Sequence, residues 1–198
     1  MHWLDADGYV IGRLLVTRGL AALYLVAFLA ALLQFRALIG ERGILPVPDF
    51  VRDHPFRSAP SLFHVRFTDR TFATVATIGA VLALLTVVGV TERLPLIACM
   101  LVWFALWVLY LSIVNVGPVW YSFGWESLLL EAGVLAVFLG NVDTAPQFLV
   151  LLLIRWLLFR VEFGAGMIKW RGDRCWRDLT CLYYHHETQP MPGPLSRW

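Results

Sequence analysis

Long uncharged hydrophobic segments alternate with polar segments along this chain. Residues 19–33, 71–90 and 94–116 contain no charged side chain, and a helix needs about 20 apolar residues to cross a bilayer. Residues 127–141 and 148–168 are also long and apolar, although each carries ionisable groups. The pattern predicts an all-α protein, a polytopic membrane helical bundle with about five transmembrane helices. We expect the spans at about residues 14–35, 71–90, 94–116, 126–141 and 147–168.

The polar segments between these spans differ in length. Residues 36–70 form a long polar loop with six arginines, four acidic residues and four prolines, whereas residues 91–93 can only form a tight turn. Residues 169–198 form a polar tail in which three prolines interrupt any helix. Short turns imply antiparallel neighbouring helices, so we expect a single transmembrane domain over residues 1–198. Residues 1–12 are acidic and no small-residue cleavage site follows, so the first span is expected to be a retained helix.

The composition agrees with a membrane protein. Apolar residues make up 59% of the 198 residues, charged residues only 15%, and the mean hydropathy of +0.69 lies outside the range of soluble globular proteins. The net charge is +2 and no basic cluster interleaves with aromatic residues, so we expect membrane lipid and not nucleic acid as a partner. Lys169 is the only lysine, which a GC-rich genome would explain; the bias towards Ala, Leu, Val and Arg also suggests such a genome.

Ionisable residues in the last two spans form a candidate buried network. Arg155, Glu162 and Lys169 are seven residues apart, and this spacing places them on nearly one face of a helix. Arg160 lies on a different face of this helix from Arg155. The antiparallel fourth span carries Glu126 and Glu131. Charged groups in lipid normally face other helices and find partners there, so we expect these two carboxylates to join the network. The network is either a structural clamp between two helices or a functional site that contains a lysine of shifted pKa.

Other reactive side chains give weaker signals. Cys175 and Cys181 could form a disulfide on an oxidising face of the membrane, and Cys99 lies in a span as a small apolar filler. His185, His186 and Glu187 lack the spacing of metal ligands, so we expect no metal. No nucleotide-binding loop or Ser-His-Asp spacing is present, and we expect no cofactor.

Three stretches resemble the lipase maturation factor family: LYLVAFLAALLQFRALIGERGILP at 23–46, WYSFGWESLLLEAGVLAVFL at 120–139, and GAGMIKWRGDRCWRDLTCLYYHHETQPMP at 164–192. The resemblance implies a membrane-embedded maturation factor for folding and assembly of secreted lipases or other exported client proteins. It also implies the endoplasmic reticulum membrane, or the inner membrane if the GC-rich bias marks a bacterial source. Family chains continue beyond this point, so we expect an N-terminal portion of a longer protein.

A second, shorter resemblance supplies an alternative function. Residues 165–170 and Asp173 are similar to a stretch of the vitamin K-dependent carboxylases, in which a lysine acts as base on a reduced quinone. This resemblance implies a membrane enzyme with a quinone cofactor and Lys169 as its catalytic base, tuned by Glu126, Glu131 and Glu162. A transporter is not favoured, because no inverted repeat is visible.

Two arguments disagree on the orientation of the chain in the membrane. With five spans, residues 36–70, residues 117–124 and the tail lie on one face. The positive-inside rule would place this arginine-bearing face in the cytoplasm. The family resemblance implies the lumen or periplasm, and we follow it because the arginines of residues 36–70 alternate with acidic residues.

Overall fold

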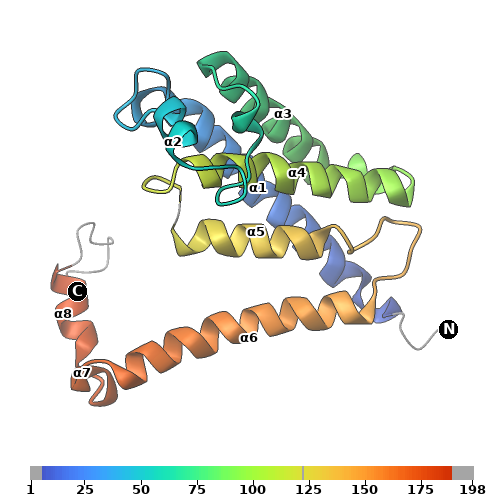
Figure 1. Ribbon diagram of the computed structural model, residues 1–198. Helices are drawn as coiled ribbons and strands as arrows, with labels where there is room; N and C mark the ends of the chain where they lie inside the picture. The colour runs from blue at the N-terminus through green and yellow to red at the C-terminus, as the bar shows by residue number, and fades with distance from the viewer. Residues whose placement is uncertain (1–5, 122, 189–198) are drawn as a thin grey trace. The chain divides into compact units, whose positions relative to one another are not determined.

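The computed structural model describes residues 6–121 and 123–188, and within these ranges every regular element is a helix (Figure 1). The predicted all-α fold is therefore confirmed. The α-helices are α1 (Val10–Leu38), α2 (Val47–Asp53), α3 (Asp69–Val87), α4 (Leu96–Val116), α5 (Gly124–Ala136), α6 (Phe148–Arg171), α7 (Arg174–Arg177) and α8 (Cys181–Thr188). Single 3₁₀ turns are η2 (Asp7–Tyr9), η3 (Leu62–His64) and η4 (Thr91–Arg93).

Three helices, α1, α3 and α4, are long and apolar enough to cross a membrane. They agree with the first three expected spans, although α1 begins earlier, at Val10, and runs for 29 residues. A capping box fixes the start of α3. The Thr68 hydroxyl oxygen accepts a hydrogen bond from Thr71 N, and the Thr71 hydroxyl oxygen accepts one from Thr68 N.

The fourth and fifth expected spans differ more from the prediction. Helix α5 has 13 residues and ends at Ala136, which is shorter than the expected segment 126–141. Its flanking residues nevertheless reach both ends of α4, because Tyr121 packs on Gly117 and the Cys99 thiol lies 3.7 Å from the carbonyl oxygen of Gly140. Helix α6 has 24 residues but falls outside the three helices that length and composition mark as spans, since it carries several charges.

The chain divides into two compact units, Met1–Ile154 and Arg155–Trp198, and the boundary falls within α6. The first unit contains α1 to α5 and the second contains most of α6 together with α7 and α8. Each unit is described by itself below.

Aromatic side chains form the centre of the first unit. The rings of Tyr24 and Phe28 on α1 lie 5.5–5.6 Å from the ring of Tyr110 on α4 in edge-to-face geometry, an arrangement that adds to the stabilisation from burial alone. Trp103 is buried beside Tyr24. Helix α3 approaches α1 closely because Gly79 lies directly against the Phe28 ring.

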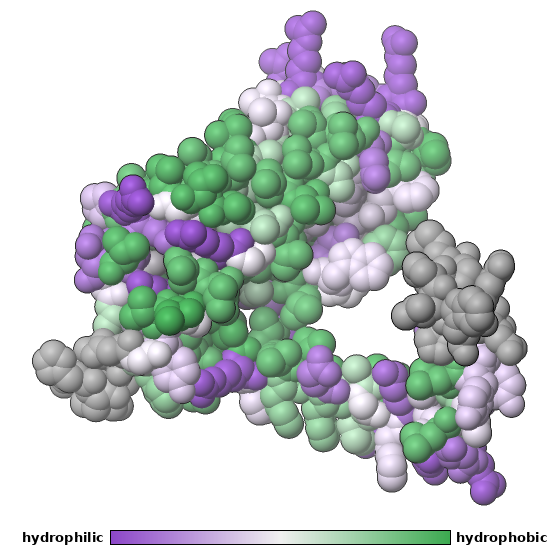
Figure 2. Space-filling view, turned by 180° about the vertical axis from the view of Figure 1, so that it is seen from behind, coloured by the Kyte–Doolittle hydropathy of each residue, from purple (hydrophilic) through white to green (hydrophobic). Residues whose placement is uncertain are grey.

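Much of the outside of the first unit is apolar. Large apolar side chains on α1, α3 and α4 are exposed on the outside of the unit, among them Leu33 at 83% and Ile97 at 72%. Figure 2 shows hydrophobic side chains over much of this unit, with hydrophilic ones gathered at separate places on its edge. Helices that are apolar all round belong in lipid, so the chain is an integral membrane protein.

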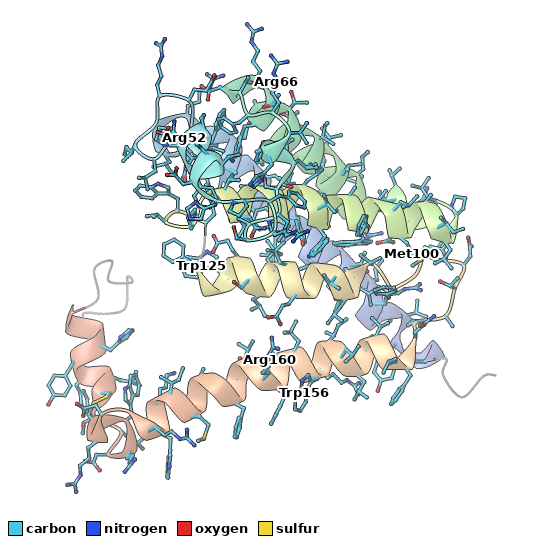
Figure 3. All side chains as sticks on the ribbon, in the orientation of Figure 1. Arg52, Arg66, Met100, Trp125, Trp156 and Arg160 are labelled. Atoms are coloured by element: carbon cyan, nitrogen blue, oxygen red, sulfur yellow. A yellow bond between two sulfur atoms is a disulfide. The ribbon has the colours of Figure 1, made fainter. Side chains whose placement is uncertain are left out.

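Polar contacts fix the loops at each end of the bundle. At the end where α4 begins, Arg13 donates to the carbonyl of Thr144 at 2.5 Å and Asn141 donates to that of Leu94 at 2.9 Å. At the other end, Ser61 donates to the carbonyl of Ser112 at 2.8 Å. In Figure 3, Arg52 and Trp125 mark this second end and Met100 the first. The polar loop 36–70 is therefore packed onto the end of α4.

Candidate functional site

A groove of about 480 Å³ opens at the end of the first unit where the polar loop meets the segment after α4. This volume is within the range of ligand-binding sites. We call it the loop-end groove, and its walls come from two stretches of chain that are far apart in the sequence. The lining residues are Ile39, Ile44, Leu45, Pro46, Asp49, Phe50, Asp53, His54, Val116, Gly117, Pro118, Val119 and Trp120.

Backbone hydrogen bonds shape the first wall of the groove. The chain after α1 folds back on that helix, because Ile44 N donates to Ala37 O and Val47 N donates to Ile39 O, both at 3.0 Å. The turn requires glycine, since a β-carbon at Gly40 would lie 2.7 Å from the carbonyl oxygen of Arg36. Pro48 in the first turn of α2 has a fixed backbone angle that suits the start of a helix.

The charged residues that line the groove are both acidic. Asp49 and Asp53 lie on α2, and Arg52 on the same helix bonds the Asp49 carboxylate at 2.8 Å and approaches that of Asp53 at 3.8 Å. Arg52 is 72% exposed and does not line the groove. Exposed ion pairs of this kind contribute about 0–1 kcal/mol to stability, so the carboxylates remain available to a ligand.

Three buried polar atoms have no hydrogen-bond partner among the described residues; they belong to the last residue of the second wall, the residue after it and the first turn of α5. They are Trp120 Nε1, Tyr121 Oη and Glu126 Oε2. Burial, with a smaller contribution from the carboxylate of Glu126, raises the pKa of Tyr121 to about 12. Tyr121 therefore keeps its donor hydrogen at alkaline pH values at which an exposed tyrosine would lose it. Buried polar atoms without partners are rare in folded proteins and are often functional.

The residues of the predicted charged network divide between the two units. Glu126 is buried in the first turn of α5, and Glu131, further along the same helix, is exposed. Arg155, Arg160 and Glu162 are exposed residues of α6 and belong to the second unit. The network, which joins residues of both units, stays a prediction.

Lys169 is exposed in the last turn of α6, and its ammonium lies 5.3 Å from the centre of the Trp176 ring. A second pair of the same kind follows, since the Arg177 guanidinium lies 5.6 Å from the Trp170 ring. These cation–π contacts fold α7 back on the end of α6. They give Lys169 a structural role that does not require a reaction.

A disulfide joins Cys175 to Cys181 and connects α7 to the first residue of α8. The side chain of Asp173 caps α7 by accepting from Cys175 N at 2.9 Å. Leu179, between the two cysteines, has a φ of +59°, which is uncommon for a residue with a side chain. Cys99 is free and buried in α4.

No group of three metal-ligating side chains occurs among the described residues. His185 is exposed on α8, and the side chains of His186 and Glu187 lie outside the described part of the structure. The loop-end groove was not expected from the sequence. The signal that could have indicated it is the combination of prolines, aromatic residues and acidic residues in the polar loop.

Comparisons with known proteins concern nearly the whole chain. Residues 11–198 match the family model of the lipase maturation factor transmembrane domain. The chain is similar to lipase maturation factor 1 of Homo sapiens, with 44% identity over an alignment of 218 residues. The alignment covers 98% of this chain and 37% of that protein. It is also similar to lipase maturation factor 1 of Mus musculus, at 40% identity over 98% of this chain and 36% of the relative.

A more distant similarity is to lipase maturation factor 2 of Xenopus laevis, at 36% identity over 90% of this chain and 27% of that protein. The chain thus spans well under half the length of these relatives. No solved structure matches it. The similarity supports the maturation-factor interpretation and adds nothing to the alternative in which Lys169 acts as a base.

Proposed function

Because this chain belongs to the lipase maturation factor family, we propose that it is a membrane-embedded maturation factor that helps secreted lipases, or other exported proteins, to fold and assemble. The observation that carries the proposal is the family match over residues 11–198. The relatives are named for lipase maturation. The chain spans only 37% of the length of the human relative, so the activity of a whole maturation factor is part of what we propose for it.

The architecture supports such a role in two ways. Helices α1, α3 and α4 anchor the chain in lipid, and the polar loop 36–70 is held on the end of α4 by side-chain contacts such as Asn115 Nδ2 to Pro60 O at 2.7 Å. A fixed surface at a membrane face is suited to contact an exported protein as it emerges. The membrane is that of the endoplasmic reticulum or, for a bacterial source, the inner membrane.

Co-expression with a secreted lipase tests this function. The host should lack a member of the family, and the probe is a lipase that the host secretes in an inactive form. We expect the chain to raise the activity per mass of secreted lipase. Equal specific activity with and without the chain, at equal expression, would overturn the proposal.

A matched pair of variants controls the experiment. Gly79→Leu should disrupt the packing of α3 on α1, because the ring of Phe28 occupies the space of a side chain there. Gly19→Leu on α1 meets nothing within 4 Å and should retain the activity. If both variants behave like the unchanged chain although Gly79→Leu is unfolded, the effect on the lipase does not come from the folded protein.

A further inference from the structure

We infer that the loop-end groove binds an extended, apolar segment of an incompletely folded exported chain that carries an arginine or lysine. The inference rests on the proposed function and adds to it the place and the chemistry of client recognition. Three features of the groove support it: its exposed apolar side chains, its two carboxylates and its buried indole N–H.

Three apolar side chains of the groove are exposed although they do not lie on a membrane-spanning helix. Ile44 and Leu45 follow α1, and Val119 follows α4, and all three are exposed. Exposure to lipid explains the apolar faces of α1, α3 and α4, whereas these residues occupy the loops between the spans. A contiguous exposed apolar surface in such a position is typical of a binding site.

The charges of the groove select among apolar ligands. Asp49 and Asp53 line it and no lysine or arginine does. Like charges would repel an anionic lipid headgroup, whereas a basic side chain would be attracted. An apolar segment that carries a basic residue therefore fits the groove better than an acidic one.

Trp120 lines the groove and carries a hydrogen-bond donor in its indole ring. Its Nε1 atom is buried and has no partner among the described residues. An extended chain presents free backbone carbonyl groups, whereas a folded protein has paired nearly all of them. A donor of this kind beside an apolar surface favours unfolded segments over folded ones.

Binding of synthetic peptides tests the inference. The chain in nanodiscs of phosphatidylcholine is titrated against three fluorescent ten-residue peptides, and empty nanodiscs are subtracted. The first alternates Leu and Ser around a central Arg, the second has Glu in place of Arg, and the third has Ser in place of every Leu. We expect the Arg peptide to bind roughly fivefold more tightly than the Glu peptide at low salt, and this ratio to fall at high salt. The Ser peptide should not bind.

Variants of the groove locate the site. The double substitution of Asp49→Asn with Asp53→Asn should bring the ratio between the Arg and Glu peptides close to one. Trp120→Phe should weaken both apolar peptides by about fivefold, which corresponds to the loss of one hydrogen bond. Asp143→Asn and Trp156→Phe change exposed residues outside the groove and should leave binding unchanged.

Each result decides the inference. Equal binding of the Arg and Glu peptides, or a ratio that the double Asn variant does not change, overturns it. Because Asp49 and Asp53 are exposed, this variant should fold even if Trp120→Phe does not. A chain that activates a lipase but binds no apolar peptide overturns this inference alone. A chain that binds the Arg peptide but leaves lipase activity unchanged overturns only the proposed function.

Discussion

The ring of Phe28 on α1 occupies the space that a side chain would fill at Gly79 on α3. Phe28 is fully buried, and its ring also contacts Tyr110 on α4. The two residues therefore set how closely α3 can approach α1, and through Tyr110 they connect both helices to α4.

Gly79→Ala should destabilise the first unit, because its β-carbon would overlap the Phe28 ring and overpacking costs about 1–3 kcal/mol. The measurement is a thermal unfolding curve in detergent. Gly19→Ala is the matched control, since Gly19 is also helical and nothing lies within 4 Å of its added β-carbon. Alanine there should keep or slightly raise stability, because glycine is a poor helix former. Equal melting temperatures for the Gly79→Ala and Gly19→Ala proteins would contradict this packing of Gly79 against Phe28.

Tyr121 should make the protein less stable as the pH rises in the alkaline range. Its pKa in the folded chain is raised to about 12, whereas that of an unfolded chain is about 10. Ionisation of the buried Tyr121 phenol therefore costs the fold nothing below pH 10 and destabilises it as the pH rises from 10 to 12, by at most about 2–3 kcal/mol. Tyr121→Phe should lose less stability between pH 8 and 11 than the unchanged chain, as measured by chemical unfolding.

The same variant should be as stable as the unchanged chain at pH 7, or more stable by up to about 1 kcal/mol, because it removes a buried hydroxyl without a partner. Tyr183→Phe changes an exposed tyrosine and serves as the control. Parallel pH profiles for Tyr121→Phe and the unchanged chain would show that Tyr121 is not protected in the fold.

The disulfide between Cys175 and Cys181 predicts a defined alkylation pattern. The chain has three cysteines, so membranes that are prepared under thiol-blocking conditions and then denatured should show one alkyl group without reductant and three after reduction. Mass spectrometry measures both. Cys99→Ser should show none and two. Three alkyl groups without reductant would contradict the disulfide and an oxidising environment for the tail.

Lys169→Arg should preserve folding and lipase maturation, because arginine can form the same cation–π contact with Trp176. A lysine that acts as a base cannot be replaced by arginine, whose pKa stays above 12. Lys169→Met removes the charge and should loosen α7, at a cost of about 0.5–1 kcal/mol. An arginine variant that inserts and melts normally but loses all function would favour the enzyme alternative.

The orientation in the membrane can be tested at Asp53 and Glu92. Asp53 lines the groove at the end of α4, whereas Glu92 lies just before the start of that helix. We expect an alkaline phosphatase fusion to be active at Asp53 and inactive at Glu92, since the polar loop should face away from the cytoplasm. The opposite pattern would support the positive-inside rule for this chain.

The sequence by itself determined the three helices that are long and apolar enough to cross the membrane, α1, α3 and α4. Some 20 residues without a charge, as at 71–90 and 94–116, have few stable conformations other than a helix in lipid, because their backbone groups must be paired internally. The long matching stretches also identified the family, which the comparisons confirm. Both conclusions depend on local properties of the chain.

Only the tertiary structure decided which side chains meet. Asp49 and Trp120 line one groove although they are far apart in the sequence, and no local pattern encodes that arrangement. Glu126 is buried and Glu131 is exposed, although both are carboxylates of one short helix. Five residues turn a helix by about 500°, so the two side chains point in different directions. The packing of α5 against α1 and α4 then determines which of the two carboxylates leaves the solvent.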